Sequence, residues 1–139
     1  MIHSQYILDI FDLAFDDHFS SDLLRRQVKF LNVKREEHTG VGLFVHFNAD
    51  NDVEQCRLDT STCANFDIKG HPTERINGIE IRNPELHILA DATVHLTNGI
   101  IDCLEIWNKS GDNYITTEPA HYELHQMWSD DNKRRTIVR

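Results

Sequence analysis

The fold is decided by residues 87–108, which read HILADATVHLTNGIIDCLEIWN. Apolar and polar residues alternate on both sides of Asn98-Gly99, and both residues at this point tolerate the positive φ that a type I′ turn requires. The stretch therefore predicts a β-hairpin, with strands at about 87–96 and 100–108. A two-residue turn also sets the register, because the residues that flank it must face each other.

The predicted register places one carboxylate in an apolar row. Counted from the two-residue turn, the pairing places Glu105 on the otherwise apolar face of the hairpin. An unpaired buried carboxylate is costly, so this glutamate is interpreted as a hydrogen-bonded structural residue or a residue at an exposed margin, and alternatively as a general acid, a general base or a binding group. The predicted pairs are Thr97 with Ile100, Leu96 with Ile101, His95 with Asp102, Val94 with Cys103, Ala92 with Glu105 and Ala90 with Trp107.

The rest of the chain predicts helices first and strands afterwards. Apolar residues within 4–15 recur at spacings of three and four, which indicates a helix, and a serine cap precedes a second, shorter helix at about 22–27. Alternation over 28–33 and 41–47 predicts two strands, the second buried on both faces for much of its length. Further strands are expected near 66–68, 76–81 and 121–127. The predicted fold class is α+β, with N-terminal helices packed on a mostly antiparallel sheet built from hairpins and a meander.

The length of 139 residues lies near the commonest size of a single domain and allows a core without disulfides or metals. The composition, 40% hydrophobic and 27% charged, has no bias towards disorder. We therefore expect one domain over residues 1–131. The basic residues 132–139 are expected to form a frayed C-terminal tail.

The net charge is −9, and it is unevenly distributed. Four of the 14 lysines and arginines lie in the last seven residues, so residues 1–131 hold 10 basic and 23 acidic side chains. A negative field of this kind repels nucleic acid and anionic lipid and steers basic proteins towards the surface. We therefore expect no nucleic-acid or membrane partner. Selection for solubility alone is an equally good explanation of the charge.

The cysteines and the N-terminus indicate a cytoplasmic protein. The three cysteines are odd in number, and Cys56 and Cys63 are separated more widely than the cysteines of a zinc knuckle. They are interpreted as free thiols. The first residues lack the basic and apolar regions of a signal peptide, and no stretch approaches 18 apolar residues. We expect a chain that does not span a membrane.

No pattern in the sequence identifies a catalytic or cofactor site. The predicted pair His95 and Asp102 resembles part of a dyad, but no nucleophile motif accompanies it, so a cross-strand surface pair is the preferred interpretation. Of the nine histidines only His121 and His125 are close in sequence, and they do not form a His-Glu-x-x-His motif. Glycine-rich phosphate loops are absent. We therefore expect no metal, no cofactor and no enzymatic activity.

Two segments resemble a group of small bacterial proteins. Residues 35–47 read REEHTGVGLFVHF, and residues 98–107 read NGIIDCLEIW. They are similar to an "RE-x-TGVGFF" strand followed by a "G-x-hydrophobic-x-x-LE" hairpin, over about a quarter of the chain. Some small acidic proteins of this kind resemble the immunity partners of polymorphic and contact-dependent growth inhibition toxins. The resemblance implies a protein that binds a cognate toxin domain and neutralises it, and it transfers no catalytic residue.

The resemblance also suggests where a toxin domain would bind. Many such toxins are nucleases with basic clefts, which an acidic surface complements. The polar stretch 49–65 is expected to be a long exposed loop and is the first choice for contact. The expected contact residues are Asp50, Asp52, Glu54 and Asp59, followed by Asp112, Asp130 and Asp131.

Two other functions remain open from the sequence. One is a small enzyme or ligand-binding domain that uses Glu105 together with His95 or His46 in a pocket lined by the sheet. The other is a structural or regulatory module that forms a symmetric dimer through its edge strands. The oligomeric state is not predicted.

Overall fold

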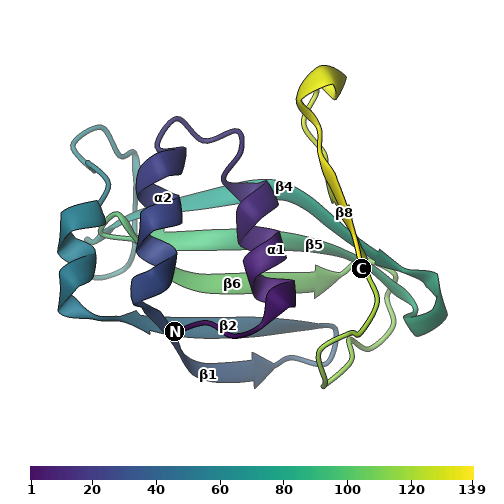
Figure 1. Ribbon diagram of the computed structural model, residues 1–139. Helices are drawn as coiled ribbons and strands as arrows, with labels where there is room; N and C mark the ends of the chain where they lie inside the picture. The colour runs from purple at the N-terminus through teal and green to yellow at the C-terminus, as the bar shows by residue number, and fades with distance from the viewer.

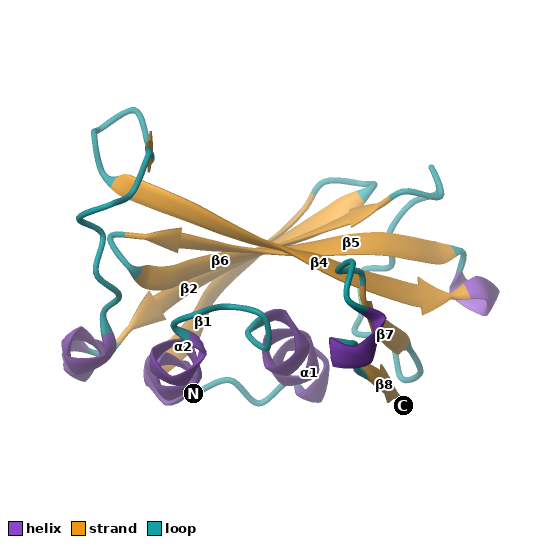
Figure 2. Ribbon diagram, turned by 90° about the horizontal axis from the view of Figure 1, so that it is seen from above, coloured by secondary structure: helices purple, strands orange, loops and turns teal.

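The computed structural model describes residues 1–139. The two α-helices, α1 (Gln5–Ala14) and α2 (Ser21–Gln27), lie next to each other on one face of an antiparallel sheet, as Figure 1 shows. Viewed from above in Figure 2, the sheet is strongly twisted and its other face carries no helix. This arrangement confirms the predicted α+β class. None of the helices has both the length and the apolar character needed to cross a membrane.

The sheet has eight strands, and every pair of neighbouring strands is antiparallel. The main path is β1-β2-β6-β5-β4-β7-β8, and β3 pairs only with β4. Because β2 lies beside β6, the sheet joins separate hairpins and is not a simple meander. The strands are β1 (Leu31–His38), β2 (Gly42–Ala49), β3 (Asn65–Phe66), β4 (Pro72–Asn83), β5 (Ile88–Thr97), β6 (Ile100–Asn108), β7 (Glu123–Gln126) and β8 (Thr136–Val138).

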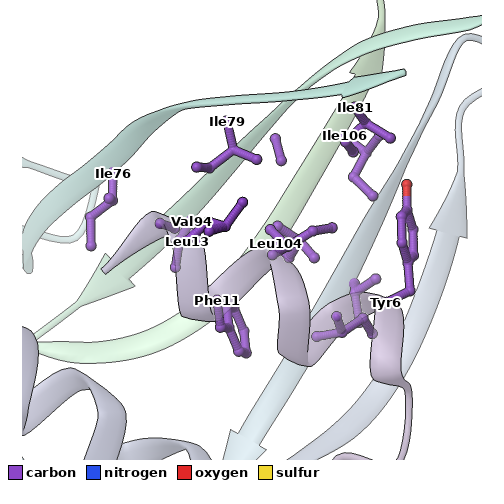
Figure 3. Packing of buried hydrophobic residues seen from close by; sticks show 14 of the residues in the cluster. Tyr6, Phe11, Leu13, Ile76, Ile79, Ile81, Val94, Leu104 and Ile106 are labelled. Carbon is purple, nitrogen blue, oxygen red and sulfur yellow. The ribbon is translucent and has the colours of Figure 1, made fainter. Parts of the chain in front are cut away.

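The core lies between α1 and the central strands. Helix α1 begins where the Ser4 side chain accepts a hydrogen bond from the Ile7 backbone N–H at 3.1 Å, which satisfies one of the free donors of the first turn. Its apolar stripe is buried against the sheet, and Ile10 and Leu13 are fully enclosed. Figure 3 shows the side chains of α1 facing those of β4, β5 and β6. The labelled residues are Tyr6, Phe11, Leu13, Ile76, Ile79, Ile81, Val94, Leu104 and Ile106.

The hairpin predicted at Asn98-Gly99 is confirmed, and its turn has the expected backbone. The φ angles are +54° at Asn98 and +76° at Gly99. Both are positive, as a type I′ turn requires. Leu96 pairs with Ile101 as predicted, but His95 pairs with Cys103. Asp102 is therefore the extra residue of a β-bulge.

The bulge corrects the predicted position of Glu105. Beyond it every pair differs by one residue from the uninterrupted register, so Glu105 lies opposite Thr93 on the face without helices. Leu104 takes the core-facing position and is fully buried. The expected apolar row interrupted by a carboxylate was wrong, because the bulge keeps Ile101, Leu104 and Ile106 all on the side of the helices.

Two other segments differ from the sequence-based expectation. Residues Val28–Phe30 form a 3₁₀ turn, η1, and not the beginning of a strand. Strand β2 alternates between buried and partly exposed residues, so it is not buried on both faces. The stretch after β2 is not a long loop throughout, because residues Asn51–Cys56 form a 3₁₀ helix, η2.

The C-terminal residues do not fray, in contrast to the expectation from the sequence. Strand β8 pairs with β7, and two arginines that flank it reach the carboxylates of α1 and of the turn after it. Arg139 donates two hydrogen bonds to the buried Asp9, at 2.9 and 3.0 Å. Arg135 contacts both Asp12 and Asp16. Secondary-structure propensity alone does not predict order in these basic C-terminal residues. The attraction between their arginines and the carboxylates explains why they are ordered here.

The ionised state of Asp9 makes the stability of the fold dependent on pH. Burial alone would raise the pKa of Asp9, but hydrogen bonds from Arg139, Tyr122 and Gln5 outweigh it and hold the pKa below its ordinary value. The unfolded chain then binds protons more readily than the folded one. The stabilisation is therefore complete above the ordinary pKa of an aspartate, about 4, and is lost as the pH falls through the lower pKa of the folded state.

Tyr122→Phe tests this coupling, because the Tyr122 hydroxyl donates to Asp9 Oδ2 at 2.8 Å. We expect the variant to lower the free energy of unfolding at pH 7 by about 2 kcal/mol, the usual loss for a hydrogen bond to a charged group. The difference should shrink below about pH 4, because the unfolded chain takes up a proton at Asp9 before the folded chain does. Urea unfolding at pH 7 and pH 3 measures it. The control is Tyr114→Phe, which removes a neutral bond to Tyr6; equal pH dependence of both variants would contradict the prediction.

Candidate functional site

Residues 49–62, called the acidic segment below, hold four carboxylates and one cation, Arg57. The segment lies beside α2, at the end of the sheet where β5 turns into β6 (Figure 1). Its backbone is held at two positions, since the Asp50 N–H donates to the Phe30 carbonyl at 2.9 Å and the Leu58 N–H to the Gly99 carbonyl at 3.1 Å. The side chains of Val53, Cys56 and Leu58 are buried beneath it.

One buried glutamine joins the acidic segment to the hairpin turn. Gln27, at the last position of α2, is fully buried. Its amide nitrogen donates to the carbonyls of Cys56 and Gly99, both at 2.9 Å, and its amide oxygen accepts from the Ile101 N–H at 2.9 Å. Three elements that are distant in sequence are thereby held in one arrangement.

Three of the four carboxylates in the acidic segment have no ion pair. Asp50, Asp52 and Asp59 are exposed and contact no lysine, arginine or histidine within salt-bridge distance. The backbone N–H and the side chain of Ser61 hold the pKa of Asp59 below its ordinary value. Only Glu54 is paired, with Arg57. The segment therefore presents three exposed carboxylates that form no ion pair within the chain and are available to a partner.

The second group of predicted contact residues lies elsewhere. Strand β6 begins at the hairpin turn and runs to the opposite end of the sheet, so Asp112, which follows it, is remote from the acidic segment. Asp130 and Asp131 lie between β7 and β8 and are paired with Lys133 and Arg134. The structure thus brings together Asp50, Asp52, Glu54 and Asp59, and separates Asp112, Asp130 and Asp131 from them.

The face without helices carries a row of residues with potential chemistry. His46 on β2 and His95 on β5 are both register partners of Cys103 on β6. Each imidazole Nε2 is hydrogen-bonded to a carboxylate, His46 to Glu37 at 3.2 Å and His95 to Glu105 at 2.8 Å. The predicted pair of His95 with Asp102 was wrong, because the bulge moves Asp102 out of register.

This row does not form a recognisable catalytic centre. His95 and Glu105 line none of the five best-defined hollows of the surface. Burial, with the nearby charges of Asp102 and Glu105, raises the pKa of the Cys103 thiol to about 12. Almost none of this cysteine is the reactive thiolate at neutral pH. No three of the chain's histidine, cysteine and carboxylate side chains are arranged to hold a metal ion.

The three thiols should differ in reactivity. Cys63 is partly exposed and its Sγ donates to the carbonyls of Asn65 and Thr73, whereas Cys56 and Cys103 are buried. We expect a thiol-reactive disulfide reagent at pH 8 to modify Cys63 quickly. Cys56 and Cys103 should react only at the rate at which the chain unfolds. Quantifying the thiols with and without denaturant measures this. The control Cys63→Ser should remove the fast phase, and fast labelling of two thiols in the native chain would contradict the prediction.

A hollow of about 240 Å³ was not anticipated from the sequence. It lies between the loop that joins α1 to α2 and residues 58–65, beneath the hairpin turn. Phe19 is 93% exposed and lines the hollow. Aromatic side chains are normally buried, so this exposure is unusual. The sequence contained a signal for this exposure, because Phe19 belongs to neither apolar helical stripe and lies within the polar run DDHFSS (residues 16–21).

The comparisons with known proteins identify no relative. No protein-family model, curated protein or solved structure matches the chain.

Proposed function

We propose that the chain is an immunity protein that binds a cognate bacterial toxin domain, a nuclease with a basic substrate cleft, and neutralises it without catalysis. The partner is held by the acidic segment, whose carboxylates take the place of nucleic-acid phosphates in the cleft. Binding of this kind needs no cofactor and no metal in the chain, and it acts by blocking the access of substrate to the toxin.

The observation that carries the proposal is the fixed, unpaired charge of Asp50, Asp52 and Asp59. Carboxylates on a mobile loop would lose conformational entropy on binding, whereas those on a backbone anchored by buried side chains of the same segment lose little. Carboxylates that form no ion pair within the chain also keep their full charge for a partner. Both properties favour fast and tight association with a basic surface.

The direct test uses the protein encoded beside this chain's gene, which the proposal expects to carry a basic toxin domain. We expect the two proteins to co-purify as a complex, and cells that produce the toxin domain to survive when they also produce this chain. Gel filtration and a growth assay measure the two effects. A toxin domain that neither binds the chain nor is neutralised by it would disprove the proposal.

Charge variants show whether the acidic segment is responsible. Replacing Asp50, Asp52 and Asp59 by asparagine should slow association with the toxin domain about tenfold at low salt and weaken its salt dependence. The matched control removes three other carboxylates without ion pairs, by Asp17→Asn, Asp22→Asn and Glu85→Gln. It changes the net charge equally, and stopped-flow association rates compare the two triple variants. Equal slowing would show that total charge, and not this segment, steers the partner.

A further inference from the structure

The hollow beneath the hairpin turn combines apolar side chains, two carboxylates and an exposed aromatic ring. Its floor is apolar and includes Leu58 and Leu96. Its wall carries two carboxylates, Asp59 and Glu74, neither of which contacts a lysine or arginine. Its rim includes the exposed ring of Phe19. An apolar floor below uncompensated negative charge suits a long side chain with an apolar stem and a cationic end.

The contacts of each carboxylate leave acceptor capacity towards the hollow. Asp59 accepts the Ser61 N–H on Oδ1 at 2.9 Å, and the Ser61 side chain also interacts with this carboxylate. A carboxylate offers about four acceptor positions, so Asp59 keeps acceptor capacity for a further donor. Both oxygens of Glu74 share the single His18 Nε2 donor, at 3.0 Å each. The Ser20 N–H donates to His18 Nδ1, so Nε2 is the nitrogen that carries the proton in the neutral ring. Glu74 therefore has His18 as its hydrogen-bond donor and no lysine or arginine partner.

The aromatic rim adds a planar surface. The Phe19 ring stacks on the His18 imidazole, with centroids 4.7 Å apart and planes inclined by 20°. One face of the phenyl ring is covered in this way, and its high exposure leaves the other face to solvent. A planar cation placed over an aromatic face is attracted by the ring quadrupole. Arginine meets this geometry better than lysine, because its guanidinium is flat and forms several hydrogen bonds in one plane.

We propose that the hollow lined by Phe19, Asp59 and Glu74 is an anchor pocket for an arginine side chain of the protein partner. The arginine stem lies along Leu58 and Leu96, and its guanidinium bonds to the two carboxylates and stacks on Phe19. The hollow measures about 240 Å³. Small-molecule sites usually measure roughly 300–1,000 Å³, so the hollow suits one side chain. Arginines buried in such pockets are among the residues that dominate interface energies. The identity of the partner rests on the proposed function, whereas the pocket itself does not.

The pocket is tested first without any toxin. NMR titration of the labelled chain with N-acetylarginine methylamide should give saturable shifts at Phe19 and Asp59, with a dissociation constant on the order of millimolar for so small a fragment. The isosteric neutral analogue, N-acetylcitrulline methylamide, should bind at least tenfold more weakly. No saturable shift at these residues, or equal binding of the two compounds, would overturn the inference.

Single substitutions test whether the arginine fragment binds in the hollow or elsewhere on the acidic segment. Phe19→Ala and Asp59→Asn should each weaken binding of the arginine fragment at least threefold. Neither change threatens the fold, because Phe19 is exposed and asparagine keeps the oxygen that accepts the Ser61 N–H. The matched control is Asp52→Asn, which removes an exposed carboxylate outside the hollow and should leave binding unchanged. Equal weakening by all three variants would indicate a diffuse charge effect and would refute the pocket.

The same variants separate this inference from the proposed function. If the toxin domain binds the wild-type chain, Phe19→Ala and Asp59→Asn should each raise its dissociation constant at least tenfold, and Ile68→Ala, which alters another fully exposed apolar side chain, should not. A toxin domain that binds all the variants equally refutes the pocket and leaves the immunity function standing. Binding of the fragment without any binding of the toxin domain supports the pocket and refutes the immunity function.

Discussion

Replacing Gln27 with leucine is expected to lower the free energy of unfolding by about 3–5 kcal/mol, because it leaves buried backbone groups without partners. The Ile101 N–H and the Cys56 carbonyl lose the partners that Gln27 provides, and the Gly99 carbonyl keeps only the Leu58 N–H. Leucine has a similar volume, so the loss comes from hydrogen bonding and not from an empty cavity.

Urea unfolding of the Gln27→Leu variant measures this loss. The control is Gln55→Leu, which replaces an exposed glutamine in η2. It should change the unfolding free energy by less than about 0.5 kcal/mol, as is usual for surface substitutions. Because Gln27 holds the acidic segment against the hairpin turn, its variant should also weaken binding of the arginine fragment under conditions where the chain is still folded. A Gln27→Leu protein as stable as the wild type would show that water satisfies these groups and that the glutamine does not organise this end of the sheet.

The sequence was sufficient for elements that depend on local pattern. The stripe within 4–15 predicted α1, and the alternation on either side of Asn98-Gly99 predicted β5, β6 and the turn. The bulge at Asp102 was missed, although it left a signal. Ile101, Leu104 and Ile106 are spaced by three and then by two residues, and strands keep such a set on one face only if one residue is extra.

The ordered C-terminus and the hollow depend on contacts between distant residues. Strand β8 is held by the pairing of Arg139 with Asp9, which lie 130 positions apart, and no local propensity predicts it. The exposed charge of the acidic segment was predictable from composition. Its proximity to Phe19 and Glu74 was not, because it arises from the packing of α2 and η2 around the hairpin turn.

Gly99→Ala is expected to lower the free energy of unfolding more than Gly40→Ala does, although both substitutions introduce the same backbone strain. The φ angle at Gly99 is +76°. A residue with a Cβ atom in this left-handed region costs about 1–2 kcal/mol. The added Cβ would also lie 2.4 Å from the Leu58 carbonyl oxygen, a backbone atom that moves only with its segment. Overpacking of this kind adds about 1–3 kcal/mol, so the total loss should be about 2–5 kcal/mol.

Gly40→Ala is the matched control, because Gly40 has a φ of +86° and no atom within 4 Å of the added Cβ. It should cost only the backbone strain of about 1–2 kcal/mol, and denaturant midpoints of the two variants measure the difference. Gly99 also lines the hollow, and displacement of Leu58 shifts the neighbouring Asp59. Gly99→Ala should therefore weaken binding of the arginine fragment while Gly40→Ala leaves it unchanged. Equal stability of the two variants would mean that the turn and the acidic segment are not in fixed contact, and the argument from a rigid display of charge would fail with it.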